Sequence, residues 1–319
     1  MKVLISIEFL PFLELRLPND LEVVPVDREG HFEGDPSDAE IYFSAGLLKP
    51  VILDRVLNAA PVVRWQHTPS SGVNHLLTPT ALARDLILTN SAGVHAIPIS
   101  EFVLALILDR AKRLRQLHSF QAQHQWDQHW KNSIFLQELS EATVLIIGAG
   151  GIGQAIAQRA SGFGMRVWGS RKHPAPHPHF EKVVGANQWH ELLPEADFVV
   201  LALPLTPETK HIINADVLKL FRPSAYLINI ARGGLVDEVA LLTALQQGWI
   251  TGAAIDAFAT EPLPPENPLW SAPNLFVTPH ISWSSPRSRR RVVDFFLANL
   301  ERYRQGQPLK NVVDRQAGY

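Results

Sequence analysis

The stretch TVLIIGAGGIGQAIAQRASGFGMRVWGSRK, residues 143–172, restricts the fold of this chain more than any other stretch does. The apolar run TVLIIG is typical of a buried strand, and the glycine-rich GAGGIG after it is typical of a turn. QAIAQRASGFG then reads as a helix, and MRVWG as a second strand. A strand, a helix and a strand in this order predict a parallel βαβ unit and hence an α/β fold.

Three glycines, Gly148, Gly150 and Gly153, form the pattern G-x-G-x-x-G between this strand and this helix. A dinucleotide-binding unit needs glycine there for the tight turn, for close approach of the backbone to a pyrophosphate, and for helix–strand packing. The strand before and the helix after favour this interpretation over the alternative, a glycine-rich turn without a ligand. Gly151 and Ile152, inside the turn, are further candidates for contact with the cofactor.

The tip of the second strand indicates which dinucleotide is bound. An acidic residue that holds the ribose 2′-hydroxyl of NAD is expected about 20 residues beyond the glycines. This chain has Ser170, Arg171 and Lys172 there instead. An arginine pairs with a 2′-phosphate, which a carboxylate would repel, so these residues favour NADPH over NADH. The alternative is that the two cations belong to a solvated loop.

Short apolar runs alternate with helical patterns on both sides of this unit, which predicts parallel sheets with crossover helices. Expected strands lie at 2–7, 21–26, 39–44, 61–66, 86–90, 166–169, 197–204, 225–231, 251–256 and 274–280. Expected helices lie at 49–59, 74–85, 97–118, 237–248 and 284–306, with a loop-like tail after Gly306.

These elements predict two Rossmann-like or flavodoxin-like domains with parallel sheets and an active site in the cleft between them. Residues 1–96 plus 285–319 would form a discontinuous substrate-binding domain, because the terminal amphipathic helix is expected to pack back on the first series of strands. Residues 97–284 would form the NAD(P)-binding domain. A chain of 319 residues is long enough for two cores.

The composition excludes several classes of function. The net charge of −2 gives no general attraction to nucleic acid or to an anionic membrane, and no apolar run is long enough to span a bilayer. The N-terminal run is interrupted by Glu8 and is interpreted as an amphipathic first strand rather than a signal peptide. Because the chain has no cysteine, disulfides and thiol catalysis are excluded, and a cytoplasmic location is expected.

Three later motifs, ARGG, GAAIDAFATEPLP and TPHI, each lie at the C-terminal end of an expected strand, where open α/β sheets bind their ligands. They contribute Arg232, Glu261 and His280. An arginine can hold a substrate carboxylate through two hydrogen bonds, and a histidine can give a proton to a carbonyl. A carboxylate beside a histidine favours the imidazolium form, so the ring can donate a proton near neutral pH.

With these motifs the chain resembles the D-isomer-specific 2-hydroxyacid dehydrogenase family over nearly its whole length, and within it the glyoxylate/hydroxypyruvate reductases. The resemblance implies that Arg232 binds the substrate carboxylate, that His280 is the acid/base and that Glu261 is its partner. It also implies that the backbone of Ser71, Gly72 and Val73 meets the substrate carboxylate. Residues expected to border the cofactor are Leu203, Pro204, Thr206, Ile230, Ala231 and Asp256.

The resemblance implies NADPH-preferring reduction of a small 2-oxo acid to the D-2-hydroxy acid by an NAD(P)-dependent homodimer, without a metal. Two alternatives stay open: a formate- or phosphonate-type dehydrogenase of the same fold, and a nucleotide-sensing, corepressor-like binding protein. Trp283 departs from the small residues that the family often has after its histidine, and it would narrow the site or pack in the hinge. Trp130 resembles an aromatic position near the dimer partner's site, with packing as the alternative.

Four histidines are expected to have structural roles rather than catalytic or metal-binding ones. His173, His177 and His179 alternate with prolines, which break any helix that could align metal ligands, so they are expected in a surface loop. His95 is expected to pack or to form hydrogen bonds rather than to act as an acid.

Overall fold

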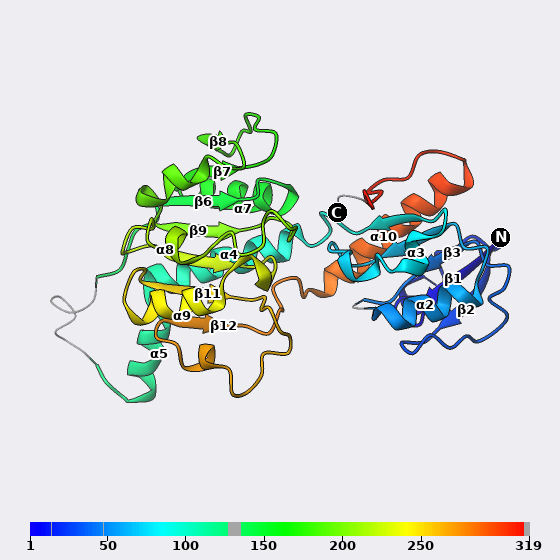
Figure 1. Cartoon of the computed structure of the whole chain (residues 1–319), viewed down its shortest axis with the longest axis horizontal. Coiled ribbons are helices and arrows are strands. Elements are labelled where there is room, and N and C mark those ends of the chain that lie inside the picture. Colours follow the sequence, from blue (N-terminus) through cyan, green and yellow to red (C-terminus); the bar gives the residue numbers. More distant parts are fainter. Residues whose placement is uncertain (14, 47, 127–134, 316–319) are drawn as a thin grey trace. The chain divides into compact units, whose positions relative to one another are not determined.

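The computed structural model describes residues 1–13, 15–46, 48–126 and 135–315. The chain divides into two compact units, Met1–His95 with Ser285–Tyr319, and Ala96–Ser284 (Figure 1). Among the described residues, no helix combines the length and the apolarity that crossing a membrane requires.

The first unit contains a five-stranded parallel sheet in the order β2-β1-β3-β4-β5 among the described residues. The strands are β1 (Lys2–Ser6), β2 (Glu22–Val26), β3 (Ile41–Phe43), β4 (Trp65–Thr68) and β5 (Ile87–Asn90). This strand order is that of flavodoxin-like sheets, which bind ligands beyond the carboxyl ends of their strands.

Helices cover both faces of this sheet. On one face α2 (Pro50–Ala59), η1 (Asn74–Leu76) and α3 (Pro79–Leu82) pack in a cluster with Leu4 of β1. On the other face α1 (Leu10–Leu13) and α10 (Pro286–Arg304) pack with Val3 and Ile5. All five residues of β1 are therefore buried, and the prediction of an amphipathic first strand was wrong because β1 is a central strand.

The second unit contains a seven-stranded parallel sheet in the order β12-β11-β10-β9-β6-β7-β8 among the described residues. Its strands are β6 (Thr143–Ile147), β7 (Arg166–Ser170), β8 (Lys182–Val184), β9 (Phe198–Leu201), β10 (Tyr226–Asn229), β11 (Gly252–Ile255) and β12 (Leu275–Val277). The order reverses between β6 and β9, which is the switch point where Rossmann-type sheets bind dinucleotides.

Helices cover both faces of this sheet too (Figure 1). One face carries α4 (Ala96–Lys112) and α7 (Gly151–Gly162), which contact each other. The opposite face carries η2 (Trp189–Glu195), α8 (Ala215–Leu218) and α9 (Glu238–Gln246). Two further short helices of this unit are η3 (Gly233–Leu235) and η4 (Pro268–Ser271). The predicted α/β class with two parallel sheets is confirmed.

Three sequence predictions of individual elements were wrong. The single helix at 97–118 is broken at Arg113, whose φ of 49° begins a separate helix, α5 (Leu114–Ala122). The strand expected at 61–66 begins only at Trp65, because the preceding residues form a turn. The pattern expected to give one helix at 74–85 instead gives the two short helices η1 and α3.

Residues 307–315 are held to the rest of the first unit rather than left as a free loop. The N–H of Val313 donates to the carbonyl of Leu88 at 2.8 Å. The guanidinium of Arg315 donates to the carbonyls of Ala81, Arg84 and Leu86. Hydrogen bonds to backbone carbonyls hold this segment, and the pattern of apolar residues in a sequence does not predict such bonds.

Candidate functional site

In the turn after β6, each of the three glycines lacks a side chain for a different structural reason. Gly148 has a φ of +106°, and a Cβ there would overlap the carbonyl of Ala202, beyond the end of β9. A Cβ at Gly153 would overlap the carbonyl of Gly148, so this glycine lets α7 pack against the turn. A Cβ at Gly150 would meet nothing within 4 Å, so this glycine borders open space that a ligand can approach.

The same turn begins α7, with Gly150 as the N-cap residue. The first N–H groups of a helix have no acceptor within the helix, and the helix dipole makes this end positive. Gly151 and Ile152 follow in the first turn of α7, at the switch point of the sheet. Together these features fit a bound pyrophosphate, the group that the sequence pattern predicts there.

The end of β7 is joined to this turn by its backbone. The carbonyl of Ser170 accepts the N–H of Gly148 at 3.1 Å and that of Ala149 at 2.8 Å. Ser170 is only 2% exposed, whereas Arg171 and Lys172 are exposed. The exposed side chains that directly follow β7 are therefore two cations, the kind of charge that a 2′-phosphate site requires.

The loop after β9 lies on the other side of the switch point. The hydroxyl of Thr206 donates to Oε2 of Glu208 at 2.6 Å. This hydrogen bond is the main reason that the pKa of Glu208 lies below its usual value, and the positive charge of Lys172 adds to the effect. Leu203 and Pro204 precede this pair, and their contact with a cofactor stays a prediction.

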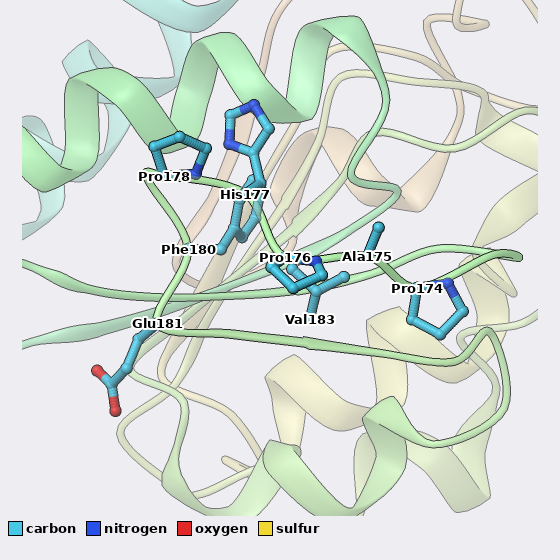
Figure 2. Close-up of a pocket in the computed structure, with 8 residues that line it drawn as sticks. All are labelled: Pro174, Ala175, Pro176, His177, Pro178, Phe180, Glu181 and Val183. Atoms are coloured by element: carbon cyan, nitrogen blue, oxygen red, sulfur yellow. The ribbon is translucent and has the colours of Figure 1, made fainter.

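A hollow with a volume of about 590 Å³ lies in the segment between β7 and β8 (Figure 2). Its lining residues are Pro174, Ala175, Pro176, His177, Pro178, Phe180, Glu181 and Val183. The ring centroids of His177 and His179 are 5.8 Å apart, and Nδ1 of His179 is 3.4 Å from the hydroxyl of Ser161. Among the described residues no cluster of three or more metal-ligating side chains is found.

Arg232 is held at the end of β10 by the amide of Asn229. The Asn229 side chain is fully buried; its Nδ2 donates to the carbonyl of Arg232 at 2.9 Å, and its Oδ1 accepts the N–H of Ala231 at 3.1 Å. Burial lowers the pKa of the Arg232 guanidinium, while the negative charge of Glu261 acts in the opposite direction. Arg232 is thus a partly desolvated cation near one carboxylate. Ile230 and Ala231 are buried in the same turn.

Gly233 lets the loop that carries Glu261 pass against this turn. A Cβ at Gly233 would overlap the backbone of Phe258 and Ala259. Two carboxylates hold the same loop: Oε1 of Glu261 accepts the N–H of Phe258 at 2.8 Å, and Oε1 of Glu238 accepts that of Ala259 at 2.7 Å. This close approach explains why the charges of Arg232 and Glu261 interact although the two residues are 29 positions apart in the chain.

His280 and Glu261 form a hydrogen-bonded pair between the loops that follow β12 and β11. Nδ1 of His280 lies 2.8 Å from Oε2 of Glu261. Burial acts to raise the pKa of Glu261, but the hydrogen bonds from His280 and from the Phe258 N–H outweigh it, so the pKa lies below its usual value. Glu261 is therefore ionised near neutral pH and can hold the imidazole ring in one orientation.

Asp256, at the end of β11, anchors the turn that carries His280. It is 1% exposed, and its Oδ1 accepts the hydroxyl of Thr278 at 2.6 Å and the N–H of Ile281 at 2.9 Å. Its Oδ2 accepts the N–H of Ser282 at 3.0 Å. The carboxylate is thus engaged by the His280 turn, and direct contact between Asp256 and the cofactor stays a prediction.

In the first unit, the turn at Ser71, Gly72 and Val73 is held by its carbonyls. Nδ2 of Asn90 donates to the carbonyl of Ser71 at 3.0 Å, and the N–H of Ser91 donates to that of Ser70 at 3.2 Å. The N–H and C=O of a trans peptide unit point in opposite directions. The N–H groups of Ser71 and Gly72 therefore point away from these partners, as an anion-binding turn requires.

Two neighbouring residues complete this turn. Nε2 of His95 donates to the carbonyl of Pro69 at 3.1 Å, so His95 has the hydrogen-bonding contact that the sequence suggested. Val73 is fully buried and fixes the far end of the turn.

The two tryptophans singled out in the sequence have different outcomes. The indole N–H of Trp283 donates to the carbonyl of His280 at 2.8 Å, and the residue is 41% exposed. Trp130 lies outside the described residues, and its predicted role stays a prediction.

Sequence reasoning missed Gly233, Glu238 and Asn90, which position functional loops rather than carry chemistry. The pair of adjacent glycines in ARGG was the available signal for Gly233, because glycines that follow a strand indicate a close approach of another backbone segment. For Glu238 and Asn90 the partners lie 21 and 19 residues away along the chain, and no local pattern indicates them.

Comparison with known proteins agrees with this geometry. Residues 104–282 match the family described as D-isomer specific 2-hydroxyacid dehydrogenase, NAD binding domain. A glyoxylate reductase of Thermococcus gammatolerans is 36% identical over 274 residues, which cover 85% of this chain and 82% of the relative.

Solved structures extend the similarity to the whole chain. A D-isomer specific 2-hydroxyacid dehydrogenase family protein of Aeromonas salmonicida has 30% identity and a TM-score of 0.86, with coverage of 98% of this chain and 99% of the other. An NADPH-dependent glyoxylate/hydroxypyruvate reductase of Sinorhizobium meliloti, in complex with NADP and sulfate, has 27% identity and a TM-score of 0.85, with coverage of 100% and 99%. The family predicted from the motifs is thereby confirmed: this chain is an oxidoreductase that belongs to the D-isomer-specific 2-hydroxyacid dehydrogenase family.

Proposed function

We propose that this protein reduces a small 2-oxo acid of the glyoxylate or hydroxypyruvate type to the D-2-hydroxy acid, with NADPH preferred over NADH. The observation that carries the proposal is the pair of His280 and Glu261 at 2.8 Å, with the cation of Arg232 near the same carboxylate. A proton donor and a carboxylate-binding cation are the two groups that reduction of a 2-oxo acid requires. The names of the glyoxylate reductase relatives support this substrate class.

Arg232 is proposed to bind the substrate carboxylate and to polarise the ketone. Its guanidinium is partly desolvated, so a substrate anion restores the favourable interactions that burial removes. In the first unit, the N–H groups of Ser71 and Gly72, with Val73 behind them, are proposed to bind the same carboxylate.

His280 is proposed to give a proton to the alkoxide oxygen that forms at C2. Because Nδ1 faces Glu261, the proton for the substrate comes from Nε2. Glu261 stays ionised and stabilises the imidazolium before the transfer. The product keeps its carboxylate on Arg232 and gains one proton on oxygen and one hydride on carbon.

The residues around the glycine turn fit a nicotinamide dinucleotide, which supplies the hydride when it is bound. Gly150 leaves open space at the N-terminus of α7 for the pyrophosphate. Arg171 and Lys172 are proposed to pair with the 2′-phosphate, with Ser170 at the same strand end. The NADPH or NADP bound in related structures supports this preference.

A homodimer is proposed through the region of α5. This helix has no buried residue, and Leu114 and Leu117 on it are each 41% exposed. An amphipathic helix whose apolar residues are exposed can bury them against a second copy of the chain. Light scattering after size exclusion measures the mass directly, and a monomer with unchanged activity would contradict the proposal.

The direct test is the initial rate with glyoxylate, hydroxypyruvate, pyruvate and phenylpyruvate, each with NADPH and with NADH. We expect rapid NADPH oxidation with glyoxylate or hydroxypyruvate and a D-configured product from hydroxypyruvate. Formate and phosphonate as substrates test the alternative dehydrogenase. Protein that binds NADPH but turns over none of these compounds would contradict the proposed function and favour a nucleotide-sensing protein.

A further inference from the structure

The peptide group between His280 and Ile281 is held at both of its ends. Its N–H, from Ile281, donates to Oδ1 of Asp256 at 2.9 Å. Its carbonyl, from His280, accepts the indole N–H of Trp283 at 2.8 Å. A peptide group is planar, so fixing both ends fixes the backbone orientation directly beside the Cα that carries the imidazole.

This backbone needs such support because His280 is in the left-handed region, with a φ of 50°. For a residue with a Cβ this conformation costs about 1 kcal/mol or more, and it persists only where the surroundings stabilise it. Asp256 stabilises the N–H side of the turn through three hydrogen bonds. On the carbonyl side of the His280 peptide, the indole of Trp283 is the partner that the structure shows.

The nearest downstream backbone N–H that is hydrogen-bonded within this turn does not donate to the His280 carbonyl. The N–H of Ser284 donates to the carbonyl of Ile281 at 2.8 Å, one residue beyond His280. The indole is a donor only, and its rigid ring reaches back three residues along the chain. It therefore gives the His280 carbonyl one fixed donor direction.

We propose that Trp283 is a positioning residue for His280, acting through the hydrogen bond from its indole to the His280 carbonyl. The inference rests on the proposed role of His280 as proton donor. Trp283 itself does not take part in proton transfer. It holds the histidine backbone so that Nδ1 meets Glu261 and Nε2 stays directed to the substrate.

The test is Trp283→Phe, which keeps an aromatic ring and removes the N–H. The matched control is Trp270→Phe, because the Trp270 indole also donates to a backbone carbonyl, that of Pro264, at 2.9 Å, and this residue is 53% exposed. We expect Trp283→Phe to lower kcat by about 3- to 10-fold, the value of one hydrogen bond, with an unchanged Kd for NADPH. Trp270→Phe should keep the kcat of the wild type.

A double-mutant cycle separates positioning from a general loss of structure. In a His280→Gln background, Trp283→Phe should lower the residual rate by less than about twofold, because the group that it positions is already absent. Trp283→Leu, which also lacks the donor, should lower kcat as Trp283→Phe does. The proposal is overturned if either variant keeps the wild-type kcat, or if Trp283→Phe lowers the residual rate of His280→Gln by its full factor.

These outcomes are distinct from failure of the proposed function. If His280→Gln itself retains the wild-type kcat, the role of His280 is wrong, and the positioning role of Trp283 is wrong with it. If His280→Gln is inactive and Trp283→Phe is fully active, only the inference about Trp283 fails.

Discussion

Two turns of the second unit place the chain in a left-handed conformation, and they do so by opposite means. After β6, Gly148 has a φ of +106° and no side chain to strain. After β12, His280 has a φ of 50° and carries the imidazole of the proposed proton donor. Glycine removes the steric cost in the first turn, whereas the hydrogen bonds that Asp256 accepts and Trp283 donates offset it in the second.

The difference follows from what each turn has to present. A dinucleotide is met by backbone N–H groups and open space, so the first turn works best without side chains. Proton transfer needs one side chain in one orientation, so the second turn cannot use glycine at the critical position. The catalytic turn therefore depends on the side chains of Asp256 and Trp283, whereas the cofactor turn depends on residues that lack side chains.

The largest effect on catalysis is expected when His280, in the second turn, is replaced. His280→Gln should lower kcat by about 100- to 10,000-fold, because the proton donor is lost. The Kd for NADPH should stay close to that of the wild type, since the glycine turn is unchanged. Stopped-flow kinetics and fluorescence titration measure the two quantities. A variant with normal turnover would remove His280 from the mechanism.

The first turn is tested by the same substitution at two of its glycines. Gly148→Ala should lower the free energy of unfolding by about 2 kcal/mol or more, because its Cβ overlaps the Ala202 carbonyl at a positive φ. Gly150→Ala meets open space, so it should change stability by less than about 1 kcal/mol while raising the Kd for NADPH at least about tenfold. Denaturant unfolding and titration of each variant give both values. Equal effects of the two variants would contradict the separate roles.

The cations beside the first turn give a smaller effect. Arg171→Asp should shift the ratio of kcat/KM for NADPH to that for NADH toward NADH by about 10- to 100-fold, because a charge-assisted hydrogen bond becomes a repulsion. Activity with NADH should change little, which serves as the internal control. An unchanged ratio would mean that the 2′-phosphate is bound elsewhere.

The smallest effect concerns the pH dependence of the second turn. The pKa of Glu261 is lowered in the folded protein, so its contribution to stability is present above its unfolded pKa and is lost as the pH falls through the folded value. Glu261→Gln should therefore be less stable than the wild type near neutral pH, by less than about 1 kcal/mol because the pair is partly exposed. This difference should shrink as the pH falls below about 4.5, the ordinary range for a glutamate. Thermal unfolding from pH 7 to pH 3 measures it, and a difference that grows toward low pH would contradict the assignment.

The sequence predicted what local patterns encode. The pattern at Gly148, Gly150 and Gly153 predicted the βαβ unit, which the structure confirms. Its position beside the switch point of the sheet was not predicted and is known only from the strand order. The motifs at Glu261 and His280 predicted a pair that the structure brings within 2.8 Å. Both follow from short segments at the ends of neighbouring parallel strands.

Elements that depend on tertiary contacts were not predicted. The break at Arg113 has no glycine or proline to mark it, so a continuous apolar pattern was read as one helix. The residues after Gly306 lack periodicity, yet hydrogen bonds to Leu88 and to the carbonyls near Arg84 hold them to the first unit. Leu88 and Arg84 lie more than two hundred residues before this segment along the chain.

By itself the sequence determined the two parallel-sheet units, the family, and the residues with the chemistry for reduction, because these depend on residue type and short spacing. The tertiary structure alone decided how the His280 turn is held. Asp256 and Glu261 reach it from the end of the neighbouring strand and the loop beyond, and Trp283 reaches back to its carbonyl. Hydrogen bonds depend on distance and direction in space, which the packing of β11 beside β12 sets for Asp256 and Glu261 and the fold of the turn itself sets for Trp283.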